Sequence, residues 1–105
     1  MTEVIYKPCE FSLLLHGHAG YAEAGKDIVC AGLSALMFSI PASLNARGIK
    51  YAIDLGATEG EARIKAYPDT DERYACMIIF ETIAEGLALM AEHHPDNVKY
   101  SKEEK

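Results

Sequence analysis

A histidine and a cysteine lie twelve residues apart near the start of this chain, at His18 and Cys30. His18 stands in a stretch bounded by Gly17 and Gly25, which indicates a loop. Cys30 falls in the expected first turn of a long apolar helix, where unpaired backbone N–H groups stabilise a thiolate. Nucleophilic catalysis by cysteine requires such a sulfur with a base beside it. The two residues therefore suggest a thiol nucleophile with its general base.

Asp27 and Ser34 flank the cysteine at helical spacing, three residues before it and four residues after it. This spacing places all three residues on one side of the expected helix. Asp27 has two interpretations that can coexist: it caps the helix, or it bonds to His18 and orients the ring as the third member of a triad does. The N–H groups of the same first turn would hold the oxyanion of an attacked carbonyl.

A metal site is an alternative interpretation of the same segment. His16 and His18 point the same way from an extended chain, because side chains alternate along a strand. With Cys30 they would make a three-ligand zinc site, but no fourth ligand stands out in the sequence. No candidate base stands near Cys9 or Cys76 in the sequence, and we expect Cys76 to be a packing residue of a helix. The leading interpretation needs no metal and no other cofactor.

The composition is that of one globular domain over residues 1–105, with half of the residues hydrophobic and a quarter charged. The formal net charge of -6 argues against direct nucleic-acid binding, which needs a basic face. Three cysteines without paired spacing predict reduced thiols and a cytoplasmic protein, and the N-terminus resembles no signal peptide. No membrane span is expected, since polar residues and a proline interrupt the apolar run after Cys30: Ser34, Ser39, Pro41 and Ser43.

Hydrophobic periodicity predicts the elements that would position these residues. The expected strands cover residues 2–7, 11–16, 50–55 and 61–67, with a short edge strand over 97–101. The first helix follows Asp27 and ends by Gly48, with Pro41 kinking or ending its regular part; the second covers 72–92. This order predicts a two-layer α+β domain: a mixed or antiparallel sheet of four or five strands under two helices. The expected buried helix positions are Val29, Leu33, Leu36, Met37, Ile40 and Leu44, then Met77, Phe80, Ala84, Leu87 and Ala91.

Three short segments carry a family resemblance: GHAGYA at 17–22, GKDIVCA at 25–31 and SAL at 34–36. Their residue types and spacing resemble the ribosomal-processing cysteine protease family. The resemblance implies a small homodimeric α+β protease with Cys30 as the nucleophile and His18 as the general base. It also implies that Asp27 and Ser34 lie near the active site. A substrate loop would order over the peptide, and it contains Gly17, Gly20, Tyr21 and Gly25.

The same resemblance implies a substrate, since the family removes a short N-terminal extension from the large-subunit ribosomal protein numbered 27. Apolar residues near the cut would need an apolar groove, for which Leu14, Tyr21 and Met37 are candidates, although we expect Leu14 and Met37 to pack in the core. Two other functions stay open. One is a ribosome-associated binding module without turnover, and the other is a small thiol hydrolase or metal-binding protein unrelated to ribosomes.

Overall fold

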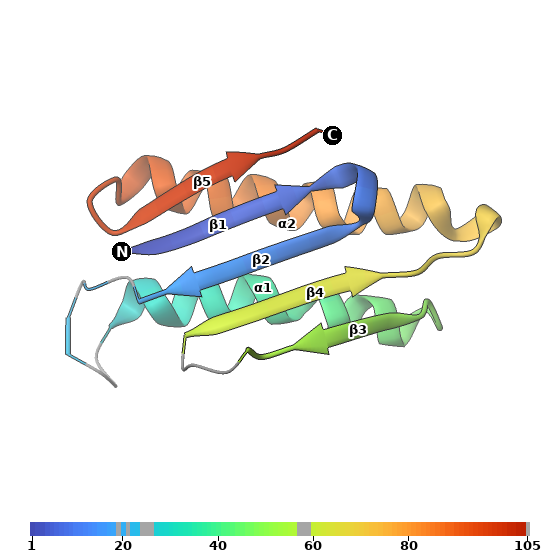
Figure 1. Cartoon of the computed structure of the whole chain (residues 1–105), viewed down its shortest axis with the longest axis horizontal. Helices are drawn as coiled ribbons and strands as arrows, with labels where there is room; N and C mark the ends of the chain where they lie inside the picture. Colours follow the sequence, from blue (N-terminus) through green and yellow to red (C-terminus); the bar gives the residue numbers. More distant parts are fainter. Residues whose placement is uncertain (19, 21, 24–26, 57–59, 105) are drawn as a thin grey trace.

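The computed structural model describes residues 1–18, 20, 22–23, 27–56 and 60–104. It has two layers, a five-stranded sheet and two helices that cover one face of that sheet (Figure 1). The predicted α+β class with two helices is therefore confirmed. The elements are β1 (Thr2–Lys7), β2 (Ser12–Gly17), α1 (Ile28–Ala46), β3 (Tyr51–Asp54), β4 (Glu61–Ala66), α2 (Arg73–His93) and β5 (Val98–Lys102), with short 3-10 turns at Pro8–Glu10 and Thr70–Glu72.

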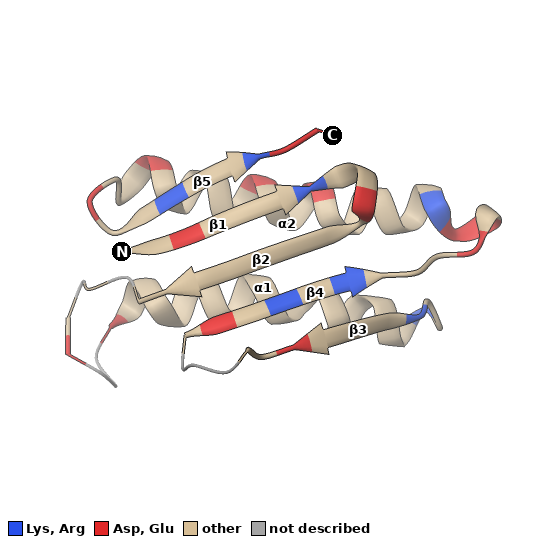
Figure 2. Ribbon diagram, in the orientation of Figure 1, with Lys and Arg blue, Asp and Glu red and all other residues tan. Residues whose placement is uncertain are grey.

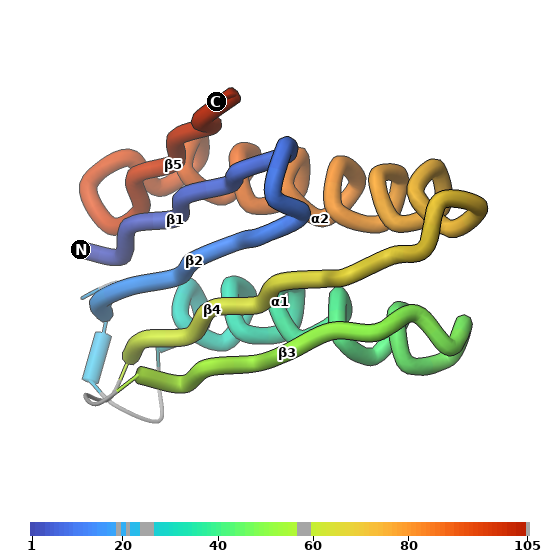
Figure 3. The backbone as a smooth tube through the Cα atoms, turned by 45° about the vertical axis from the view of Figure 1, so that its right-hand side comes forward, coloured from blue at the N-terminus to red at the C-terminus, as the bar shows by residue number. Residues whose placement is uncertain are grey.

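The sheet is mixed, with the strand order β3-β4-β2-β1-β5. β1 with β2, β2 with β4, and β3 with β4 are antiparallel pairs, whereas β5 runs parallel to β1. β3 and β5 therefore form the two edges of the sheet, as the smooth backbone trace shows (Figure 3). α1 lies against the half of the sheet that contains β4 and β3, and α2 lies against the half that ends in β5 (Figure 1).

The predicted alternation on β4 is confirmed. Ala62, Ile64 and Ala66 are buried under the helices, because successive side chains of a strand point to opposite faces. The predicted start of β2 at residue 11 is wrong by one residue. Phe11 has a left-handed backbone (φ 49°) and closes the tight turn that joins β1 to β2, so the ladder begins at Ser12.

Pro41 does not end α1, so this part of the prediction is wrong, while the predicted kink stays a prediction. α1 continues to Ala46, and Gly48 follows it with φ +70°, as expected of the residue that ends a helix. Proline has no N–H, so residue 41 donates no hydrogen bond to the turn before it. The Pro41 ring is buried against the core, and the apolar contact it makes there offsets the missing bond.

The buried side of α2 agrees with the prediction at Phe80, Ala84 and Leu87, Ala91 is half-buried against the core, and only Met77 differs. Cys76 takes the first buried position, while Met77 is 39% exposed. The expected packing role of Cys76 is therefore confirmed and that of Met77 is wrong. The predicted stripe on α1 is buried at every position except Leu36, which is half-buried.

Both helices are long and apolar enough to cross a membrane when length and hydropathy alone are considered: Ile28–Ala46 and Thr70–His93. The expectation that Ser34 and its polar neighbours break the apolar run of α1 is thus wrong on this measure. Each helix nevertheless buries its apolar stripe against the sheet, and a helix that covers a core needs this composition. Gly32 allows α1 to lie close to α2, since a Cβ at residue 32 would stand 3.1 Å from the Cε of Met90 on α2.

Phe80 holds the two layers together, and its truncation should destabilise the fold strongly. Its ring is fully buried, stacks on Tyr6 at 6.2 Å between centroids, and meets Phe11 edge-on at 6.5 Å. We expect Phe80→Ala to lower the free energy of unfolding by about 3–5 kcal/mol. Urea denaturation measures this loss. Tyr74→Ala is the control, because Tyr74 is 73% exposed and should change stability by less than about 0.5 kcal/mol. Equal losses would contradict the packing described for Phe80.

Candidate active site

Three segments meet at one end of the molecule. β2 ends there, α1 begins there, and β4 starts there after Gly60 (Figure 1). His18 directly follows β2, and Cys30 is the third residue of α1. The topology therefore brings the predicted base and the predicted nucleophile to the same end of the sheet, although they belong to different elements.

Asp27 caps α1, as the sequence predicted. Its carboxylate Oδ1 accepts a hydrogen bond from the backbone N–H of Cys30 at 2.9 Å, and its carbonyl accepts one from Ala31 at 3.1 Å. The N–H of Cys30 is thus directed at a carboxylate, so Ile28 and Val29 carry the first-turn N–H groups that suit an oxyanion. The second interpretation of Asp27, that it orients His18, stays a prediction.

The His18 ring lies against Gly60, the residue that directly precedes β4. The N–H of Gly17 donates to the Gly60 carbonyl at 2.9 Å, which ties the end of β2 to the start of β4. A Cβ placed on Gly60 would stand 2.9 Å from His18 Nε2 and 3.0 Å from Cε1. Gly60 also has φ +84°, so its backbone favours glycine. A glycine before the strand was the only signal in sequence, and it does not reveal which side chain comes close.

Gly60→Ala should therefore displace the His18 ring and lower activity. A shift of about 1 Å in a catalytic group commonly costs about 100-fold in rate, and we expect a loss of that size in kcat/KM. Gly48→Ala is a matched control, because Gly48 also has a positive φ of +70° but has no atom within 4 Å of an added Cβ. Both variants place a side chain at a positive φ, so an equal loss of activity in both would contradict a specific role of the contacts of Gly60 with His18 and with the Gly17 carbonyl oxygen, which would stand 3.0 Å from the added Cβ.

The three cysteines have different environments. Cys30 is half-buried at the margin of the core, Cys9 is exposed, and Cys76 is fully buried in α2. Burial raises the pKa of the Cys76 thiol to about 11, with a smaller contribution from Glu72. Cys76 therefore stays a protonated packing residue at neutral pH, whereas the Cys30 sulfur is not sealed inside the core.

Alkylation should distinguish the three thiols. We expect iodoacetamide to modify Cys30 faster than Cys9, since the first turn of a helix stabilises an anionic sulfur, and to leave Cys76 unmodified until the protein unfolds. Mass spectrometry of tryptic peptides at successive times measures the three rates. Modification of Cys76 as fast as Cys30 in the native protein would contradict this assignment.

An apolar cavity of about 320 Å³ opens beside Ser34 and Gly60. It lies between the start of α1 and the β3–β4 end of the sheet. Ser34, one turn after Cys30, contributes to its wall, and so does Gly60, on which His18 rests. The other lining residues are Leu15, Phe38, Leu55, Glu61 and Ala62. The cavity is placed to receive a side chain of a peptide bound at the cysteine.

Two of the three residues suggested earlier for an apolar groove, Leu14 and Met37, do not line this cavity. Met37 is fully buried in the core, as expected of its packing role. Leu14 lies opposite Arg63 and lines a hollow on the open face of the sheet, so the prediction that it packs in the core is wrong. Residue 14 alternates with the buried Leu13, which explains the opposite orientation. Tyr21 lies outside the described residues.

The predicted substrate loop is described only in part. Gly17 is the last residue of β2 rather than a loop residue, and it has φ +99°. Gly20 has φ +69°. Gly25, like Tyr21, belongs to the residues that the structure does not describe.

Among the described residues, His16 belongs to no group that could hold a metal ion. Its ring is exposed, and Nδ1 lies 3.2 Å from Oε2 of Glu61 on the neighbouring strand. Within residues 1–18, 20, 22–23, 27–56 and 60–104, no group of three or more His, Cys, Asp or Glu could hold a metal ion. His16, His18 and Cys30 therefore do not form the three-ligand zinc group considered from sequence.

Comparison with known proteins identifies the family. The family model for cysteine protease Prp matches residues 5–99 of this chain. This chain belongs to the cysteine protease Prp family. The ribosomal processing cysteine protease Prp of Bacillus subtilis is 28% identical over 92 residues, covering 84% of this chain and 81% of the relative. Prp of Staphylococcus aureus (strain Mu50) is 31% identical over 88 residues, covering 83% of this chain and 81% of that relative. Family membership makes the predicted thiol chemistry that of a cysteine protease.

Solved structures share the fold. A crystal structure of S. aureus Prp with a covalently linked product peptide superposes with a TM-score of 0.80 at 21% identity, covering 97% of each chain. The same protease with a substrate peptide gives a TM-score of 0.74 at 20% identity and the same coverage. A protein of Streptococcus mutans gives 0.76 at 23% identity, with 99% of this chain and 93% of that chain covered. The two-layer architecture is therefore that of the Prp structures.

Proposed function

We propose that this protein is an endopeptidase that removes the N-terminal extension of the large-subunit ribosomal protein numbered 27. The observation that carries the proposal is the placement of a half-buried Cys30 in the first turn of α1, at the end of the sheet where His18 stands. The curated relatives are named ribosomal processing proteases, and two Prp structures contain a substrate or a product peptide. Because ribosomal proteins are made in the cytoplasm, we also place this protease there.

The proposed reaction follows from the positions of these groups. His18 takes the proton of the Cys30 thiol, and the sulfur then attacks the scissile carbonyl carbon. The negative charge moves to the carbonyl oxygen, where first-turn N–H groups of α1 stabilise it. The C–N bond breaks as the imidazolium gives its proton to the leaving amine. Water then hydrolyses the thioester, with His18 accepting a proton from the water and returning it to the departing sulfur.

A peptide that spans the extension and the first residues of the mature ribosomal protein tests this function. We expect mass spectrometry to show cleavage at one site by the wild-type protein. Binding without cleavage would favour the ribosome-associated module, and hydrolysis only of simple thioesters or esters would favour an unrelated thiol hydrolase. Either outcome would overturn the proposed endopeptidase.

We further propose a homodimer formed through the outer face of α2 and the adjoining alanine residues of α1, a contact that leaves Phe38, on the β3 side of α1, uncovered. α1 carries no Lys, Arg, Asp or Glu along its 19 residues (Figure 2). Its exposed positions include Ala31, Ala35 and Ala42, whose small side chains let another helix approach closely. Ile78 and Leu89 on α2 are 44% and 53% exposed, and their spacing of eleven residues places them on one side of the helix. The absence of charge on α1 and the exposed apolar residues of α2 suit a second copy, with Glu85 the charged residue on the same side of α2 as Ile78 and Leu89.

Light scattering after size-exclusion chromatography tests this assembly. The wild-type protein should elute with twice the mass of one chain. Leu89→Glu should elute as a monomer, since it would bury a charge in the contact. Tyr74→Glu, which changes an exposed residue at the far end of α2, should leave the dimer intact. A monomeric wild type, or a Leu89→Glu dimer, would overturn the proposed interface.

A further inference from the structure

The free edge of β3 has features of a site for an extended peptide. β3 is a terminal strand of the sheet, and within the described part of the chain it pairs only with β4. In an antiparallel pair alternate residues direct their N–H and C=O groups at the partner. The remaining residues of this four-residue strand therefore direct theirs outward, where another strand can pair with them.

The middle of β3 also lacks the charged side chains that protect the opposite edge of the sheet. The opposite edge strand, β5, carries Lys99 and Lys102, and Lys102 pairs with Glu81 and Glu104. In the middle of β3 stand Ala52 and Ile53, neither of them charged. Charged side chains on an edge strand discourage pairing with another chain. Of the two edges, β3 is thus the one open to a further strand.

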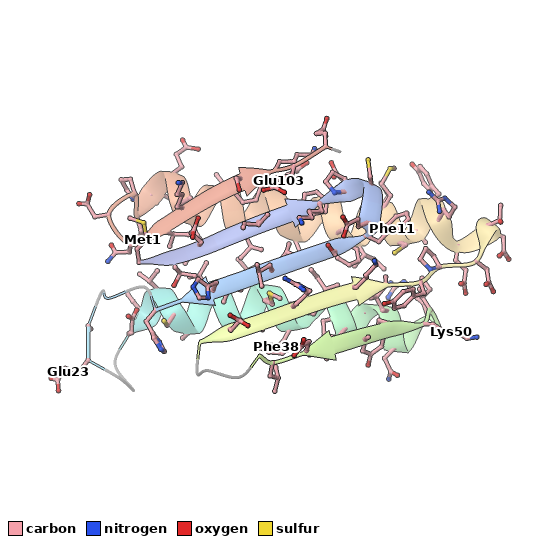
Figure 4. All side chains as sticks on the ribbon, viewed as in Figure 1. Met1, Phe11, Glu23, Phe38, Lys50 and Glu103 are labelled. Carbon is pink, nitrogen blue, oxygen red and sulfur yellow. The ribbon has the colours of Figure 1, made fainter. Side chains whose placement is uncertain are left out.

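An apolar strip runs along this edge toward the candidate active site. Ile53 lies opposite the buried Ile64, so its side chain is on the helix-covered face, and it is 42% exposed. Phe38 on α1 is 42% exposed and lies beside β3 (Figure 4). Leu55, just after the strand, is 59% exposed and lines the 320 Å³ cavity together with Phe38 and Gly60. The apolar strip therefore ends at the 320 Å³ cavity. Gly60, the residue against which the His18 ring lies, lines this cavity.

We propose that the peptide substrate adds to β3 as a sixth strand and places every second side chain on this apolar strip. The inference rests on the proposed endopeptidase function and names how its substrate is held. Strand addition gives affinity through backbone hydrogen bonds, while pockets for alternate side chains give specificity. β3 has four residues, so about four residues of the peptide, or about 13 Å, pair with it.

The geometry defines the class of substrate. Side chains on the helix-covered side meet Ile53, Phe38 and Leu55 and should be large and apolar. The intervening side chains lie on the open face of the sheet, beside Ala52, Asp54 and the charged residues of β4, and can be polar. The substrate is therefore an extended segment in which apolar and polar residues alternate next to the cut.

A scan of N-methylated peptides tests the backbone pairing. Each amide of the ribosomal-protein peptide near the cut is methylated in turn, which removes one N–H donor and leaves the side chains unchanged. KM should rise about tenfold at every second position of the paired segment and change little at the positions between. No alternation, with the parent peptide still cleaved, would overturn strand addition but leave the protease function standing. Absence of cleavage of the parent peptide would instead overturn the protease function.

Two variants test the apolar strip. Ile53→Ser and Phe38→Ser should each raise KM for the long peptide about tenfold and leave kcat nearly unchanged, because they remove apolar contacts distant from the reacting atoms. Cleavage of a short peptide with two residues on each side of the cut should not respond to Ile53→Ser. Tyr74→Ser is the matched control, an exposed aromatic residue on α2. Unchanged KM for the long peptide in both strip variants would overturn the proposed contact.

Discussion

Cys30→Ala is expected to abolish cleavage of the ribosomal-protein peptide. Alanine keeps the helix and the cap, since Asp27 binds the backbone N–H of residue 30 rather than its side chain. The variant lacks the sulfur proposed as the nucleophile, so kcat should fall by at least about 10⁴-fold. Single-turnover assays with mass detection measure the residual rate over several hours.

Two controls are needed to interpret the loss of cleavage by Cys30→Ala. Cys9→Ala removes an exposed thiol at the opposite end of β1 from the candidate site and should cleave at the wild-type rate. Circular dichroism should show that Cys30→Ala is folded, because residue 30 is only half-buried. Cleavage by Cys30→Ala at more than about one-hundredth of the wild-type rate would show that another group is the nucleophile.

His18→Ala should produce the second-largest loss. A positioned general base contributes about 10²–10⁴-fold, and His18 would also protonate the leaving amine, so kcat should fall within that range. The residue stands outside β2 and is exposed, so its removal should not unfold the protein. Initial rates of cleavage of the ribosomal-protein peptide measure the effect.

His16→Ala is the matched control for His18. Both histidines border the end of β2, but the His16 ring lies beside Glu61, whereas the His18 ring lies against Gly60. We expect His16→Ala to change kcat by less than about threefold. Alkylation of Cys30 by iodoacetamide should slow in His18→Ala and not in His16→Ala. Equal effects of the two variants would contradict the assignment of His18 as the base.

Short-range sequence patterns were sufficient to predict most of the helices and strands. β1 has the predicted bounds, and β4 differs by one residue, because strict alternation of apolar and polar residues is a short-range signal. The cap at Asp27 was equally local, since a carboxylate and the N–H three residues later lie within one turn. The errors arose where burial in the tertiary structure decides the outcome. Pro41 is buried inside α1, and Cys76 rather than Met77 is buried at the start of α2.

The sequence by itself determined the residue types of the candidate site and its family, because a histidine and a cysteine at this spacing between glycines form a motif that needs no coordinates. Only the tertiary structure decided what surrounds them. Gly60 and Leu55 are distant from Cys30 in the chain, and they reach the site through the pairing of β4 with β2 and β3. Strand register and strand order are non-local, since they depend on how the whole apolar face is buried, and no short segment encodes them.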